Sequence, residues 1–219
     1  LCIAVSSGSA AEVILKSEFS HPNLSEWKTF SRGTAPNVLV RDGVLEGKRS
    51  KSTGLVALSR WFDKSRTKLA VEFSLAVSQT RGRAFHIWTQ EPNGRDASQL
   101  NLCVQNGRLQ HFDGRDRAWY TVPAKIQASK NPKNPVWHRI RAVMNAKERG
   151  LDLWVSKPGS LDLPEKKTAT MAGYRINLPY AGISFVSGTR IADGAWYLVD
   201  DLVVESGSDI PRPGKVDPL

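Results

Sequence analysis

The chain has 219 residues, of which 40% are hydrophobic and 24% charged, an ordinary balance for a soluble globule that can fold as one large all-β domain. Its 31 Lys and Arg residues against 21 Asp and Glu residues give a net charge of +10, which favours acidic partners. The basic residues are scattered and form no nucleic-acid-binding motif, and no apolar run is long enough to cross a membrane, so we expect neither a nucleic-acid partner nor a membrane span.

The first segment, 1–11, is a short apolar piece that ends in the small residues Ala10 and Ala11. This pattern is typical of the end of a secretory signal, with cleavage after either alanine; the end of a lipobox at Cys2 is the alternative. We therefore expect a signal-peptide remnant and a secreted, periplasmic or cell-surface protein. Without Cys2 the domain would hold Cys103 alone, which excludes an intramolecular disulfide and is more typical of a bacterial secreted protein.

Apolar and polar residues alternate with a period close to two along most of the chain, which predicts strands. Single strands are expected at 13–19, 27–30, 54–62, 68–77, 83–90 and 119–122. Hairpins are expected at 37–46 around Asp42-Gly43, at 99–112 around Asn106-Gly107, and at 136–156 around 147–150. No amphipathic helix is expected.

The last part of the chain begins with a Pro- and Gly-containing excursion over 157–180. Two strands, 182–190 and 194–205, follow and are joined through a turn at Asp193-Gly194; a Pro/Gly tail occupies 207–219. The sequence therefore predicts an all-β fold over 12–206, an antiparallel two-sheet β-sandwich of the jelly-roll kind.

Several local patterns belong together: an opening Phe19 with Leu24–Trp27, the hairpin 38–45, the strand 68–73, Trp137–Arg141 with 151–155, and the closing Trp196–Val204. With these patterns the chain resembles the concanavalin A-like lectin/glucanase superfamily from residue 13 to residue 206. The resemblance implies a jelly roll. That superfamily includes lectins, laminin-G-like adhesion modules, glycoside hydrolases and polysaccharide lyases, so it does not choose among these activities.

The catalytic patterns of the superfamily's enzymes are missing. Its hydrolases carry Glu-x-Asp-x-x-Glu on one strand, and here the nearest carboxylates, Glu91 and Asp96, lie on an expected loop. The histidine- and tyrosine-bearing strands of its alginate lyases are not matched by Gln110-His111 or by Trp119-Tyr120. The sequence therefore favours a non-catalytic protein; a divergent catalytic site that uses His86, Glu91 and Tyr120 is the alternative.

One face of the central strands combines aromatic, amide and guanidinium groups, as a carbohydrate-binding surface does. Alternation along 83–90, and pairing across the Asn106-Gly107 turn, place a set of side chains on that face together with Cys103. The outward ring of Trp119 is added to this set. The predicted carbohydrate-binding residues are His86, Trp88, Gln90, Asn101, Gln105, Arg108, Gln110 and Trp119. An ordinary polar sheet surface is the alternative reading, and a one-residue shift of register would reverse every assignment.

No metal or other cofactor is expected. Asp193, Asp200 and Asp201 offer oxygen ligands for a structural Ca²⁺, but their spacing fits turn anchoring better, and zinc lacks its Cys and His ligands. The predicted function is that of a secreted, lectin-like module that binds a polysaccharide or glycoconjugate, with anionic glycans favoured by the charge. The alternatives are a polysaccharide-degrading enzyme and a laminin-G-like adhesion module.

Overall fold

A computed structural model describes residues 10–17, 19, 24–31, 38–49, 56–90, 100–113, 118–148, 150–172, 179–186 and 192–210. These residues form strands and turns, and they include no helix, hence none that could cross a membrane. The strands are β1 (Glu12–Ser17), β2 (Lys28–Ser31), β3 (Val38–Arg41), β4 (Val44–Lys48), β5 (Val56–Arg66), β6 (Lys68–Val77), β7 (Phe85–Gln90), β8 (Asn101–Gln105), β9 (Arg108–Asp113), β10 (Ala118–Lys125), β11 (His138–Asn145), β12 (Gly150–Val155), β13 (Ala169–Ala172), β14 (Tyr180–Val186) and β15 (Trp196–Ser206).

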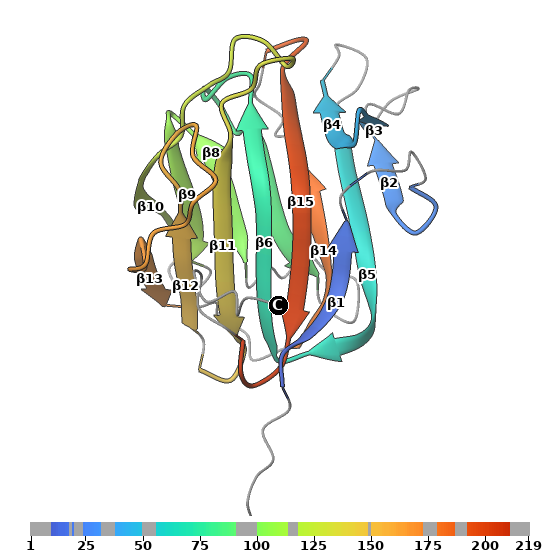
Figure 1. The fold of residues 1–219 in the computed structure, drawn as a ribbon, viewed down its shortest axis with the longest axis vertical. Helices are drawn as coiled ribbons and strands as arrows, with labels where there is room; N and C mark the ends of the chain where they lie inside the picture. The colour runs from blue at the N-terminus through green and yellow to red at the C-terminus, as the bar shows by residue number, and fades with distance from the viewer. Residues whose placement is uncertain are drawn as a thin grey trace, which may run out of the picture.

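The strands make two antiparallel sheets that pack face to face (Figure 1). One sheet, called the β6 sheet below, has the order β13-β12-β11-β6-β15-β4-β3, with β1 paired to β15. The other, the β7 sheet, has the order β10-β9-β8-β7-β14-β5-β2. The predicted all-β, two-sheet sandwich is therefore confirmed.

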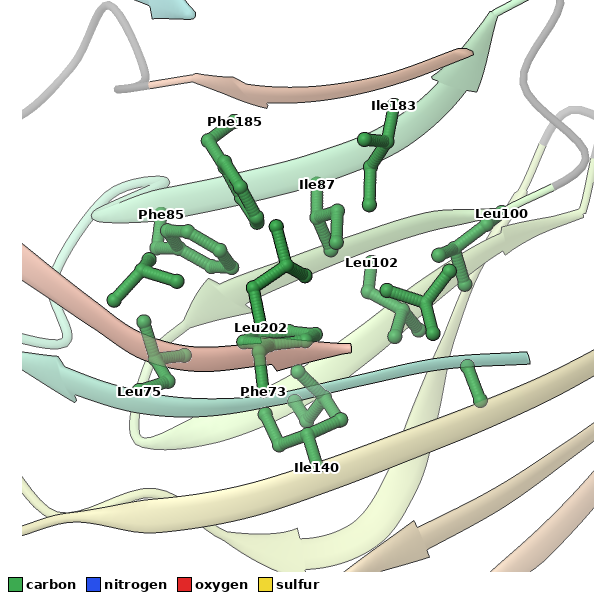
Figure 2. Packing of buried hydrophobic residues seen from close by; sticks show 14 of the residues in the cluster. Phe73, Leu75, Phe85, Ile87, Leu100, Leu102, Ile140, Ile183, Phe185 and Leu202 are labelled. Carbon is green, nitrogen blue, oxygen red and sulfur yellow. The ribbon is translucent and has the colours of Figure 1, made fainter. Parts of the chain in front are cut away.

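Large apolar side chains from both sheets meet between the layers (Figure 2). Phe73 of the β6 sheet lies 5.9 Å from the rings of both Phe85 and Phe185 of the β7 sheet, and all three are fully buried. Tyr197 joins them with an edge-on contact to Phe85 at 5.3 Å. Because such rings bury large apolar areas and prefer tilted contacts, this layer supplies much of the folding free energy.

The predicted hairpins are confirmed, and two of them turn as their sequences predict. Asp42 and Gly43 have φ values of 51° and 78°, and Asn106 and Gly107 have 51° and 72°. Positive φ at both loop residues is the geometry that suits the twist of a two-residue hairpin, and Asn-Gly and Asp-Gly adopt it most readily.

The two predicted closing strands are present as β14 and β15. They are not neighbours: β14 pairs with β5 and β7 in one sheet, whereas β15 pairs with β6, β4 and β1 in the other. The Asp193-Gly194 turn, with φ of 75° at Gly194, therefore precedes a crossover strand of the opposite layer. The excursion also contains a short strand that was not predicted, β13, which pairs with β12.

Asp200 and Asp201 mark an irregularity in β15. The pairing of β15 with β6 shifts register between Asp200 and Val203, and Asp201 has a φ of 48°. Asp200 accepts a hydrogen bond from the amide of Asp201 at 2.7 Å, as predicted for turn anchoring. Asp201 does something else, because its carboxylate accepts hydrogen bonds from Ser74 and Arg139. The aspartate pair is thus a β-bulge that turns one carboxylate onto the neighbouring strands.

The outer face of the β6 sheet carries a network of ion pairs over β6, β11 and β15. The carboxylate of Glu72 forms ion pairs with Arg139 (Nε to Oε1, 2.9 Å) and with Arg141 (Nη1 to Oε2, 2.7 Å). Arg141 also pairs with Glu205 (Nη2 to Oε2, 2.6 Å). Arg139 reaches Asp201 at 3.0 Å. Because Arg141 is only 5% exposed, its carboxylate partners offset the cost of burying its charge.

Replacing Glu72 with Gln is expected to lower the free energy of unfolding by about 2 kcal/mol, since both arginines lose a shared partner and keep one carboxylate each. Urea unfolding monitored by tryptophan fluorescence measures this change. The matched control is Asp63→Asn, because the side chain of Asp63 is 73% exposed and its ion pair with Arg66 is long, at 3.5 Å. A loss for Glu72→Gln no larger than that of the control would contradict the assignment.

Candidate functional site

The predicted carbohydrate-binding residues lie together on the outer face of the β7 sheet, over β7, β8, β9 and β10. His86 pairs with Cys103 and Trp88 with Asn101, while Cys103 pairs with Gln110 and Gln105 with Arg108. This is the predicted register, and it places these side chains opposite the buried Phe85, Ile87 and Leu102. Gln90 ends β7, and its side chain lies outside the described part.

An aromatic cluster stands on this face. It consists of Arg83, His86, Trp88, Phe112 and Trp119. The Trp119 ring stacks on His86 at 5.4 Å and touches Phe112 at 5.2 Å, and the Arg83 guanidinium lies 4.8 Å from its centroid. Trp88 meets His86 edge-on at 5.7 Å. Sequence reasoning missed Phe112 and Arg83, although Phe112 is the cross-strand partner of Trp119.

The contact between His86 and Trp119 also reports the shape of the sheet. β10 is three strands away from β7, which on a flat sheet would separate their backbones by about 14 Å. Two rings on parallel, upright side chains could not then approach to 5.4 Å. The β7 sheet therefore curls toward its outer side over these four strands, so that Trp119 leans across β9 and β8.

This lean buries residues that alternation alone would leave exposed. Cys103 is fully buried and His86 is 7% exposed. Burial raises the pKa of the Cys103 thiol to about 12, a shift that nearby Arg83 partly offsets. Burial, reinforced by Arg83, lowers the pKa of His86 to about 4. The thiol is consequently unreactive at neutral pH, and His86 is a neutral support for the tryptophan rings.

The charge on this face has one sign. Among the described residues of and next to β7–β10, the charged side chains on the outer side are Arg83, Arg108 and Lys125, all of them exposed and none in an ion pair. The carboxylate of these strands, Asp113, is 4% exposed and alternates onto the inner side. The arginines of the β6 sheet, by contrast, are held by carboxylates. In the described part of the chain, the basic charge beside the aromatic cluster therefore has no carboxylate partner.

The described half of the excursion lies away from this face. Ser156 donates to the carbonyl of Ser160, the amide of Gly159 donates to Trp137, and the amide of Thr168 donates to Leu153. These contacts hold 157–168 against β11 and β12, at the edge of the β6 sheet. Within the described part, the excursion does not cover the aromatic cluster.

The described residues do not bring together the alternative catalytic site or a metal site. Glu91 and Asp96 lie outside the described residues. Tyr120 sits opposite His111, whose side chain is buried between the sheets, so it does not share a face with His86. The described residues contain no group of three His, Cys, Asp or Glu side chains that could hold a metal ion. Arg139 already occupies the carboxylate of Asp201.

No protein-family model matches the chain, and no curated protein matches it in sequence. Solved structures do match its fold. A sialidase superposes with a TM-score of 0.69 at 15% identity over 89% of this chain, which spans only 18% of that protein. The catalytic domain of a GH131 β-glucanase from Podospora anserina gives 0.54 at 11% identity over 92% of this chain and 98% of its own. Basic winged bean lectin, solved with Tn-antigen, gives 0.54 at 10% identity, covering 90% and 98%.

At these identities the matches establish the fold. The chain is a jelly roll of the concanavalin A-like type, as the sequence patterns predicted.

Proposed function

We propose that this chain is a lectin-like module that binds acidic polysaccharides through the outer face of β7–β10, and that it does so outside the cell. The observation that carries the proposal is the combination of two partly exposed tryptophans, Trp88 and Trp119, with the unpaired cations Arg83, Arg108 and Lys125 on one curled face. Aromatic rings pack against the apolar faces of sugar rings, and guanidinium groups bind carboxylates or sulfates in a bidentate manner.

The strand pairing arranges the aromatic and the basic side chains in two neighbouring rows across the sheet. Trp88 and Asn101 pair across β7 and β8, and the chain of cross-strand neighbours continues to Phe112 and Trp119. Arg108 and Gln105 pair at the hairpin end of the same face, where Lys125 also pairs with Arg108. A polysaccharide that crosses the strands would thus meet an aromatic row beside a basic one. The structural neighbours include a lectin and a β-glucanase domain, which is compatible with a glycan ligand.

The proposal predicts that Trp88→Ala weakens binding to a uronate or sulfated polysaccharide about tenfold or more, because a sugar loses its stacking surface. Arg108→Ala should weaken binding less and should also reduce its dependence on salt, since one exposed charge contact is removed. Affinity gel electrophoresis at two ionic strengths measures both effects. Lys133→Ala, which removes an exposed charge from a loop elsewhere, is the control.

Unchanged retardation of both Trp88→Ala and Arg108→Ala would refute this site. The same polysaccharides also test the enzymatic alternative, because a lyase produces an unsaturated product that absorbs ultraviolet light and a hydrolase releases reducing ends. Neither product should form with the wild-type chain.

A further inference from the structure

The structure contains a cavity on the outer side of the β6 sheet, away from the aromatic cluster. Its volume is about 920 Å³, within the range of small-molecule sites. It lies over β11 and β12 and beneath the segment 165–170 that leads into β13. Its polar and aromatic lining includes Lys68, Glu148, Asp152, Trp154, Glu165 and Lys167.

The central carboxylate of this cavity is held in one orientation. Lys167 Nζ donates to both oxygens of Asp152 at 3.0 Å, and the hydroxyl of Thr170 donates to one of them at 2.8 Å. Asp152 and Thr170 are cross-strand partners, which fixes their separation. The result is a compact group of ammonium, carboxylate and hydroxyl, already oriented before any ligand arrives.

Trp154 supplies an aromatic group beside this carboxylate. It lies two residues after Asp152 on β12, so both side chains are on the outer face of the strand. Trp154 is 4% exposed, and its indole N–H has no hydrogen-bond partner in the described structure. The nitrogen itself has almost no exposed surface, so Trp154 contributes an aromatic wall of the cavity and no donor to a ligand.

The charges of the cavity balance, unlike those of the outer β7 face. Lys68, Lys166 and Lys167 stand against Glu148, Asp152 and Glu165. Lys167 and Asp152 neutralise each other at 3.0 Å, so they present hydrogen-bonding atoms and little net charge. A strongly charged ligand would gain nothing here. A ring with neighbouring hydroxyl groups would both donate to the carboxylate and accept from the ammonium.

We propose that this cavity is a second binding site, for a neutral saccharide unit, on the sheet opposite the proposed acidic-glycan surface. Asp152, oriented by Lys167 and Thr170, accepts hydrogen bonds from two ring hydroxyls, and the sugar ring lies beside Trp154. The chain then joins two chemically different glycans. This site stands independently of the function proposed above, because it shares no residue with the outer face of β7–β10.

The test is saturation-transfer NMR and calorimetric titration of the full chain with neutral hexose and pentose oligosaccharides that carry no acidic group. Wild type should bind a member of this panel. Asp152→Asn, which replaces one carboxylate oxygen acceptor by an NH₂ donor, should weaken binding about tenfold. Trp88→Ala should leave it unchanged.

Thermal unfolding of each variant shows whether it folds. If Asp152→Asn fails to fold, Thr170→Val decides, since Thr170 is exposed on the edge strand and its loss only releases the Asp152 carboxylate. No binding of any neutral oligosaccharide by wild type would overturn the proposal, and so would binding that survives in Asp152→Asn or Thr170→Val but is lost in Trp88→Ala. Loss of acidic-polysaccharide binding in Trp88→Ala reports on the other surface alone.

Discussion

Acidification from pH 6.5 to pH 4 is expected to remove most of the stability of this protein. Two histidines, His86 and His111, are buried, and burial lowers the pKa of each to about 4. Nearby Arg83 lowers the pKa of His86 further, whereas Asp113 and the backbone of Asn101 partly offset the shift of His111. A third buried histidine, His138, has its pKa lowered in the same direction, although it accepts a hydrogen bond from the amide of Gln127 at 3.1 Å.

Stability falls on acidification because the unfolded chain binds protons that the folded chain does not bind. Below pH 6.5 the unfolded chain protonates these histidines, whereas the folded chain keeps them neutral until about pH 4. Stability is therefore fully present above pH 6.5, falls between pH 6.5 and 4, and levels off below that range. Each shift of this size corresponds to about 3 kcal/mol, and two such shifts rival the whole stability of an ordinary domain.

Urea unfolding at pH 7.0 and at pH 4.5, followed by circular dichroism, measures this dependence. His111 is the residue to change, because it is fully buried between the sheets. His111→Leu should reduce the difference between the two pH values by about half, while it changes the stability at pH 7.0 much less. An unchanged difference in His111→Leu would show that other groups cause the acid sensitivity.

The register of the central hairpin was predictable from the sequence for a physical reason. Asn106 and Gly107 both accept positive φ, so a two-residue loop forms there. This loop fixes the cross-strand pairs of β8 and β9, such as Cys103 with Gln110 and Val104 with Leu109. The face that these pairs build was therefore predicted correctly, residue by residue. Local chemistry was sufficient because the contacts are local.

The curl of the sheet was not predictable in this way. It brings Trp119 onto His86 from three strands away, and the residue pattern of neither β7 nor β10 predicts this contact. Lys125 was missed because the predicted strand ended at residue 122, whereas β10 continues to Lys125 and an irregularity between Thr121 and Lys125 brings Lys125 opposite Arg108. The same limit explains the closing strands. Which sheet receives β14 or β15 depends on partners far away along the chain, such as β5 and β7 for β14 and β6 for β15.

A second large effect is expected at Gly47, whose missing side chain makes room for an aromatic ring. Gly47 on β4 pairs with Tyr197 on β15, and the Tyr197 ring lies directly against the glycine. A Cβ atom added to Gly47 would fall far inside the contact distance of the ring. The ring cannot turn away cheaply, because Tyr197 is 1% exposed and packs edge-on against Phe85.

Gly47→Ala is therefore expected to lower the free energy of unfolding by about 3 kcal/mol or more, by overpacking a core that has no free volume at this point. Thermal and urea unfolding measure the loss. Gly150→Ala is the matched control, because it also adds one methyl group to a glycine at a strand position, and nothing lies within 4 Å of the new atom. That control should change stability by less than about 1 kcal/mol.

The cause of the loss can be separated from a general intolerance of β4 by a double-mutant cycle. Tyr197→Leu removes the obstructing ring, so in that background Gly47→Ala should cost less than about 1 kcal/mol, even though Tyr197→Leu is itself destabilising. The two changes would then be strongly non-additive, since both act on one contact between β4 and β15. Additive losses would instead mean that the backbone of Gly47, and not the Tyr197 ring above it, requires glycine.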